Sequence, residues 1–243
     1  MKKLPLFLLV LAWFFLPGAK ASDLPEFRPA LMGPYRNSLI NEINTKRLVA
    51  KGQKDAVVCF TCAVLSGGAG ADLMVYRGTP GSELLQKELL RHGSTSKFTP
   101  GVFEHEKVVV NFIATAVFIV RGGQPHLRIY MNQQEDDLNK GADFVAPQIA
   151  FPLKSKPVRP LWPAGAPTKS GAVALLNLDV DSRGKLTGVS VTYEHPEGKG
   201  FGAAAVKAFR TYNLIPGFRD GKPVTCRSTF PVLFITGRKT RFE

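Results

Sequence analysis

Two cysteines, Cys59 and Cys62, have the Cys-x-x-Cys spacing of a redox dithiol or of half a zinc site. A redox pair of this kind lies at a helix N-terminus and a zinc-binding pair lies in a tight turn. The surrounding residues, AVVCFTCAVLSG, instead favour a β-strand. Along a strand the two Cα atoms would be about 10 Å apart on opposite faces, beyond the roughly 7 Å limit for a disulfide. We therefore expect both thiols, and Cys226, to be small apolar core residues, and keep a thiol oxidoreductase as a third functional hypothesis.

Other residue types that could do chemistry show no productive spacing. Glu104, His105 and Glu106 fall in a predicted turn, and the four histidines have no metal-ligand spacing. The sequence contains no nucleophile elbow, phosphate-binding loop or dinucleotide fingerprint. We therefore expect no enzyme activity, no metal site and no cofactor.

The first 21 residues have the pattern of a secretory signal peptide. Lys2 and Lys3 precede an apolar run, and Ala19-Lys20-Ala21 supplies a small-x-small cleavage site. The apolar run is shorter than the ~20 residues of a membrane-spanning helix. These features predict a periplasmic protein beginning at Ser22. Retention of residues 1–21 as an inner-membrane anchor, with the rest facing the periplasm, is the alternative.

The chain is basic, with a formal net charge of +13. Loss of Lys2, Lys3 and Lys20 with the signal peptide would leave +10, which is 13 − 3. Such a charge can simply keep a protein soluble, or it can attract an anionic envelope surface. Nucleic acid is not an expected partner outside the cytoplasm.

The sequence repeats itself at a constant offset. Val57 aligns with Val173 (173 − 57 = 116), and the same shift aligns Gly68 with Gly184 and Phe118 with Phe234. Each copy reads as strand, turn, strand, helix, strand, with helices predicted at residues 82–91 and 201–212. The predicted fold class is α+β, with two small domains, each a short antiparallel sheet (β-β-α-β) with one helix packed across it.

The domain boundaries follow from this repeat. Residues 22–145 form the first domain, with a leading helix at 37–50 and an extra strand at 126–132, and residues 171–243 form the second. Residues 146–170, which are rich in proline, are expected to be an extended linker without a packed element. Each domain should have its own core. The first is Phe60, Val64, Leu84, Leu85, Leu89 and Phe118, and the second is Leu176, Val180, Phe201, Val206, Phe209 and Phe234.

The second copy resembles the C-terminal domain of TonB proteins. The matching features run from residue 159 onward: Pro-x-aromatic-Pro, a strand ending in Val-Asp before a Gly turn, a helix containing Ala-Ala, and Gly-Lys-Pro-Val before the last strand. The first copy resembles a diverged version, with a leading helix closer to the TolA relatives. The resemblance implies that a partner peptide pairs with the edge of the sheet, and that the segment before the domain contributes contacts. Arg159 stands where the TonB pattern has Gln.

The last strand, predicted at residues 224–235, contains Pro231. Because proline donates no backbone hydrogen bond, this strand should be an edge. In the first copy a Gly-rich turn at 121–125 predicts a hairpin whose second strand covers the equivalent edge. A partner strand is therefore predicted along residues 225–230. Its predicted contacts are Thr225, Arg227, Thr229 and Phe230, with Arg159 and Trp162 on the flank. Coverage of this edge by the first domain, or by a second copy in a homodimer, is the alternative.

These observations predict a non-catalytic periplasmic binding or adaptor protein that pairs an envelope protein or peptide strand along an exposed sheet edge. The alternative is a membrane-anchored, TonB-like energy transducer for outer-membrane transport. Such a transducer needs a retained anchor and a long spacer, whereas residues 22–34 would reach about 45 Å fully extended.

Overall fold

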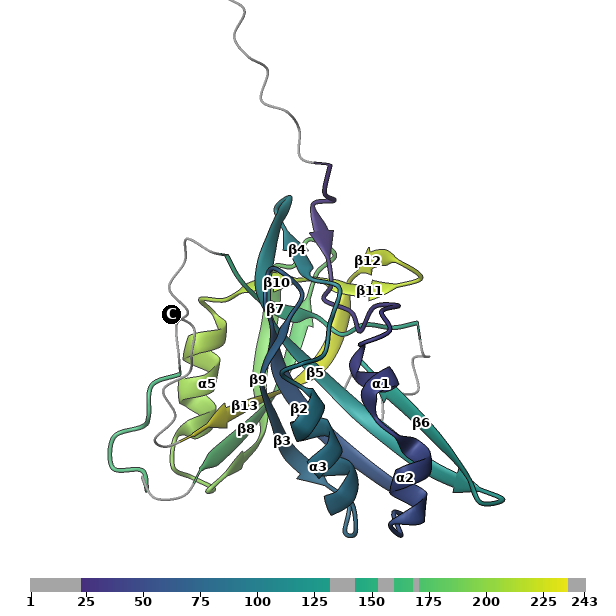
Figure 1. Ribbon diagram of the computed structural model, residues 1–243. Coiled ribbons are helices and arrows are strands. Elements are labelled where there is room, and N and C mark those ends of the chain that lie inside the picture. Colours follow the sequence, from purple (N-terminus) through teal and green to yellow (C-terminus); the bar gives the residue numbers. More distant parts are fainter. Residues whose placement is uncertain (1–22, 132–142, 153–159, 168–170, 236–243) are drawn as a thin grey trace, which may run out of the picture.

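The computed structural model describes residues 23–131, 143–152, 160–167 and 171–235, and these are mostly β-structure (Figure 1). The strands form a large, nearly closed antiparallel sheet of eight strands, a three-stranded sheet and a two-stranded ribbon. No helix among these residues is long and apolar enough to cross a membrane.

The long strand β5 (Glu106–Arg121) organises the large sheet. On one side it pairs with β2, and β3 pairs with the far side of β2. On its other side β5 pairs in turn with β4, β7 and β6, while β1 extends β4 and β10 extends β7. The bounds are β1 Phe27–Arg28, β2 Ala56–Val64, β3 Gly70–Gly78, β4 Gly101–Phe103, β6 Gln124–Tyr130, β7 Gln148–Phe151 and β10 Asn213–Ile215.

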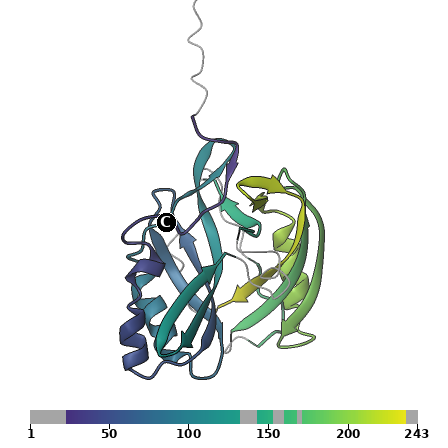
Figure 2. The ribbon, with the colours of Figure 1, turned by 90° about the vertical axis from the view of Figure 1, so that its right-hand side faces the viewer.

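The small sheet has the order β13-β8-β9, with β8 (Ala172–Val180) between β9 (Leu186–His195) and β13 (Cys226–Phe234). Helix α5 (Phe201–Phe209) packs across β8 and β9. Figure 2 separates the two sheets, with the small sheet and α5 in green and yellow. The ribbon consists of β11 (Gly217–Arg219) and β12 (Lys222–Val224).

The two halves share a strand register at the offset seen in the sequence. Ala56 pairs with Phe118 in the large sheet, and Ala172 pairs with Phe234 in the small one. Each first hairpin also has a bulge at the same place, between Cys59 and Phe60 and between Leu175 and Leu176. Strand β3 therefore occupies in the first half the position that β9 occupies in the second.

The predicted helices form with changed limits. The single leading helix at 37–50 is wrong: α1 (Leu39–Glu42) and α2 (Thr45–Ala50) are separated by Ile43 in an extended conformation. The Asn44 side chain accepts a hydrogen bond from the Arg47 amide. Asn44 is thus the N-cap of α2, and a new helix begins after it. Helix α3 (Glu83–His92) lies where the sequence predicts it, and α5 ends at Phe209, before residue 212.

Both predicted core sets are confirmed. Most of their members are buried in two separate clusters, and Leu84 and Val206 pack at the margins of the first and second cluster. Some hydrophobic side chains nevertheless pack in the core of the opposite half. Ile113 and Ile149 belong to the second cluster, and Ile215 and Phe218 belong to the first.

The predicted fold class, two small β-β-α-β domains, is wrong. Strand β7 comes from the segment predicted as an unpacked linker, and β10 comes from the second half, yet both belong to the large sheet. The physical reason lies between Pro147 and Pro152, where Gln148–Phe151 contains no proline and can pair on both sides. The buried Gln148 side chain also bonds both the amide and the carbonyl of Ala30, at 2.7 and 2.9 Å.

The predicted β5–β6 hairpin is confirmed, because residues 124–130 pair with β5 as far as Thr115. In the small sheet, a bulge in β9 places Val191 and Tyr193 on opposite faces. The bulge leaves Thr192 without a register partner, so Val191 lies opposite Leu176 while Tyr193 lies opposite Leu175, and these two face opposite sides of β8.

Candidate functional site

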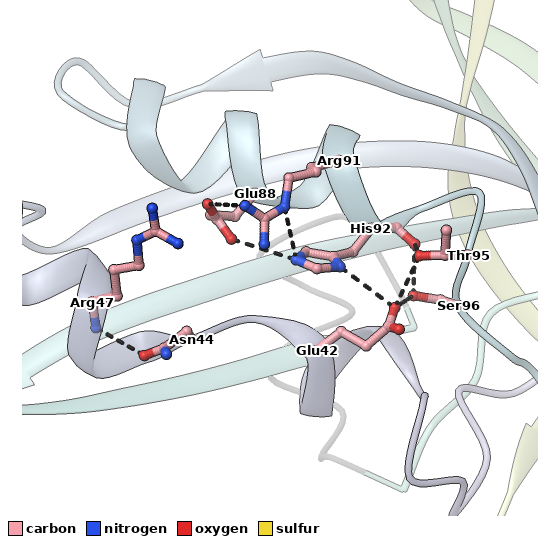
Figure 3. A network of polar contacts seen from close by, with 8 residues as sticks. All are labelled: Glu42, Asn44, Arg47, Glu88, Arg91, His92, Thr95 and Ser96. Carbon is pink, nitrogen blue, oxygen red and sulfur yellow. Dashed lines mark hydrogen bonds and ion pairs between the residues drawn. The ribbon is translucent and has the colours of Figure 1, made fainter.

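A cluster of polar side chains joins α1 to α3 in the first half (Figure 3). The His92 ring lies between two carboxylates, 3.7 Å from Glu42 and 3.5 Å from Glu88. Ser96 is 1% exposed. Its hydroxyl can donate to either of two acceptors, Glu42 Oε2 at 2.7 Å or the His92 carbonyl at 2.8 Å. Arg91 Nε donates to His92 Nε2 at 3.2 Å.

This cluster contains the residue types of a serine hydrolase but not the geometry. A nucleophilic serine must bond the imidazole that takes its proton. Ser96 bonds a carboxylate and a backbone carbonyl instead, and it is buried. The contacts join α1, α3 and the loop after α3. We interpret the cluster as a structural contact that holds α1 against α3.

The cysteines lie as the strand interpretation requires. Cys59 and Cys62 both lie within β2, but the expectation of a buried core residue is confirmed for Cys62 alone, because Cys59 and Cys226 are half-buried. Cys62 is 2% exposed, and burial raises the pKa of its thiol far above the ordinary value. A thiol kept protonated in a core is a poor nucleophile and a poor metal ligand. No group of potential metal ligands occurs among the residues that the structure describes.

Strand β13 contains three of the six predicted partner contacts, and Thr225 directly precedes it. Within the described ranges its only strand neighbour is β8, so it is an edge strand. Arg227 is engaged within the sheet, because its guanidinium bonds both oxygens of Asp179 at 2.7 and 3.0 Å. Thr229 donates to Asn177 at 2.8 Å, and the Thr225 hydroxyl accepts from the Ser182 amide at 3.2 Å. The buried Phe230 ring packs on Phe209.

The edge of β13 faces the first half across a very small cleft. Residues 228–230 and Leu178 of β8 form one wall, and Asn111, Ile113, Met131 and residues 146–148 form the other. The cavity volume is about 10 Å³, which is the room of about one water molecule. A peptide strand needs about 4.8 Å of lateral space beside its neighbour. The first half therefore occupies the place beside residues 228–230 that the sequence assigned to a partner.

The two predicted flanking residues do not complete a site at this edge. Arg159 lies outside the described residues. Trp162 packs edge-on against Phe201 and Phe234, with ring centroids 5.2 and 6.1 Å away. It therefore closes the second core at the end of β13 that is distant from Thr225.

Strand β9 is the other edge of the small sheet, and it is open. Within the described part of the chain its only strand neighbour is β8. Residues 190–193 are all exposed, and Val191 and Tyr193 are 42% and 50% exposed. Val191 lies on the α5 side of the sheet and Tyr193 on the outer face, so the edge presents apolar surface on both sides.

The other long edges carry charge or proline, whereas the middle of β9 has neither and has instead the bulge at Thr192 and α5 across one face. Charged side chains, proline and a covering helix are the usual protections of an edge strand. Strand β3 has Asp72 and Arg77, β6 has Pro125 and is covered by α2, and β13 has Pro231. Residues 187–193 of β9, TGVSVTY, have neither charge nor proline. This uncharged run is the sequence signal that could have identified the edge.

The electrostatics around β9 are one-sided. Glu194 accepts hydrogen bonds from backbone amides at the start of α5, first of all that of Gly202, and these hold the pKa of its carboxyl below the usual range. Asp181 accepts from the Arg183 and Lys185 amides, both at 2.9 Å. These acids are thus satisfied internally. Five basic residues near β9 have no ion pair with any described residue: Arg183, Lys185, Lys199, Lys207 and Arg210.

Comparisons with known proteins give no relative: no family model, no curated protein and no solved structure matches this chain. The geometry of the small sheet is therefore the basis for a functional proposal.

Proposed function

We propose that this protein is a non-catalytic binding protein of the cell envelope that takes up an extended partner segment by strand addition at the open β9 edge. Strand addition derives affinity from main-chain hydrogen bonds, and specificity from alternate side chains. The observation that carries the proposal is the uncharged run of residues 187–193 in the ten-residue edge strand β9, of which residues 190–193 are exposed.

Three features of β9 support a docking role. Its length exceeds the usual strand of about five to six residues, so a partner could form several main-chain bonds. Val191 and Tyr193 offer apolar contact on opposite faces to alternate side chains of a partner. The corresponding strand β3 has Arg77 where β9 has Tyr193 (193 − 77 = 116). The two strands therefore share one register but differ in the charge at this edge position.

A peptide titration tests the proposal. The probe is a synthetic nine-residue peptide with five central residues alternating valine and threonine and two serines at each end. We expect amide hydrogen exchange to slow within residues 186–195 and to stay unchanged within residues 226–234. The same peptide with alternate backbone nitrogens methylated should lose binding, because it cannot form the ladder. Protection confined to β13 would place the partner at the sequence-predicted edge instead.

A matched pair of variants separates the β9 edge from general surface effects. Tyr193→Arg gives β9 the residue that β3 has, and should weaken the neutral peptide about tenfold, or about 1.4 kcal/mol. Arg77→Tyr makes the reverse change on β3 and should leave binding at β9 unchanged. Equal affinity of the wild type and Tyr193→Arg would contradict docking at β9.

A further inference from the structure

The chemistry of the partner segment follows from the charges that surround β9, and this step rests on the proposed function. Three acidic side chains near the edge are already engaged: Glu194 of β9 with amides at the start of α5, Asp181 in the β8–β9 turn, and Asp179 with Arg227. Their charges are thus partly offset by backbone amides or by a guanidinium. Glu197, which follows β9, is exposed and has no such bond among the described residues, but it is outnumbered by the basic residues, so electrostatic selection at this edge should follow the basic residues.

The basic residues lie at both ends and along one flank of β9. Arg183 and Lys185 are in the turn that leads into the strand, and Lys199 is in the loop that follows it. Lys207 is exposed on the side of α5 that faces away from the sheet, whereas Arg210 is exposed just after α5 and continues the i+4 row that runs from Gly202 through Val206. A Cβ at Gly202 would touch Val191, so this row borders the β9 edge.

The centre of the edge has the opposite character, because residues 187–193 are uncharged and include two exposed apolar side chains. A segment that fits this surface has β-branched or aromatic residues in its middle and carboxylates toward its ends. From this pattern we infer that β9 binds an acidic extended peptide with an apolar centre.

A second copy of this chain is the competing occupant. Two β9 strands could pair around a two-fold axis, since the uncharged run offers no repulsion of its own. Each copy, however, brings the same unpaired bases on α5 and a net positive charge, with 32 Lys and Arg against 19 Asp and Glu in the whole chain. Self-pairing would bring like charges together, whereas an acidic peptide would neutralise them.

The test compares three peptides that share one alternating valine–threonine centre and end in glutamate, serine or lysine pairs. Affinity for the whole protein is measured by titration at 50 mM and 500 mM salt. We expect the glutamate peptide to bind about tenfold tighter than the lysine peptide at low salt, and the ratio to approach one at high salt, where screening shortens the range of exposed charges.

Variants assign the selectivity to the flank of α5. The double change Lys207→Gln and Arg210→Gln should remove most of the preference for glutamate ends while leaving affinity for the serine peptide unchanged. Its control is Lys46→Gln with Lys87→Gln, which removes the same charge from exposed positions of the first half. The control should keep the full preference.

The outcomes distinguish failure of this inference from failure of the proposed function. Equal binding of all three peptides, lost in Tyr193→Arg, would keep strand addition and overturn the acidic partner. No protection of β9 by any of the peptides would overturn both. A concentration-dependent dimer in sedimentation, abolished by Tyr193→Arg and strengthened by salt, would assign the edge to a second copy.

Discussion

Strands β3 and β9 are the corresponding edges of two halves that share one register, and they differ in how they meet solvent. A helix lies against each strand, α3 against β3 and α5 against β9, but the sequence GADLMVYRG of β3 has charges at Asp72 and Arg77. In β9 the corresponding positions are Gly188 and Tyr193. The same backbone arrangement can therefore end a sheet or extend it, depending on a few edge side chains.

The middle strands extend this comparison. Burial along β8 alternates over all nine residues, as in a sheet with one covered face, whereas β2 is buried continuously from Phe60 to Val64. Both faces of β2 are therefore covered from Phe60 to Val64, whereas one face of β8 is only half-buried. This difference is consistent with the proposal that a partner binds the second half.

The largest expected effect comes from removing equivalent core rings. Phe118→Ala and Phe234→Ala should each destabilise the protein by about 3–5 kcal/mol, since both rings are buried at the same register position. Because the two cores exchange isoleucine and phenylalanine side chains, each variant should unfold in one transition. Far-UV circular dichroism and Trp162 fluorescence, which reports the second core, should give the same midpoint. Two separated transitions would show that the halves are independent domains.

Equivalent glycines give the next largest effect. Gly68 and Gly184 have φ of +86° and +78°, and a Cβ on either would strike a backbone carbonyl, that of Phe98 or Leu214. Replacing either glycine with alanine should lower the free energy of unfolding by about 3 kcal/mol, because backbone strain and the close contact act together. Gly198→Ala is the control, because its φ is +65° with nothing within 4 Å, and it should cost about 1 kcal/mol. Denaturant midpoints measure all three, and equal losses would mean that the carbonyl contact is unimportant.

A smaller effect should separate two buried serines. Ser228 occupies the place of Phe112 in the first half (228 − 112 = 116), and its buried hydroxyl has no hydrogen-bond partner within the described residues. Ser228→Ala should be neutral or stabilising by up to about 1 kcal/mol, whereas Ser96→Ala, which breaks bonded contacts, should cost about 1–2 kcal/mol. Urea unfolding measures both, and a clear loss for Ser228→Ala would mean that its hydroxyl is satisfied.

The smallest effect concerns the exposed Asp179–Arg227 pair. The Arg227 hydrogen bond holds the pKa of Asp179 below its ordinary 3.8, so the ionised carboxylate contributes stability above that pH and loses it as the pH falls further. Arg227→Ala should therefore lower the melting temperature slightly at pH 7, and the difference should vanish in strong acid. A difference that persists in acid would point to packing of the arginine stem instead.

The sequence by itself determined the elements that are local or repeated. Alternation predicted β2 and β8, the Gly-rich turn predicted the β5–β6 hairpin, and the periodic apolar residues identified both cores. Strand geometry also removed Cys59 and Cys62 from the candidates for redox chemistry. These features depend on side chains that are close in sequence or related by the constant offset, so a pattern suffices to find them.

Only the tertiary structure decided how the halves join and which edge stays open. Pairing of β7 with β5 and β10 brings together residues far apart in the chain, and no local pattern specifies such a partner. Pro231 correctly marked β13 as an edge, but whether an edge meets solvent depends on what packs beside it. The first half lies against residues 228–230, while no described strand pairs with the free side of β9, and so the candidate site moved from one edge of the small sheet to the other.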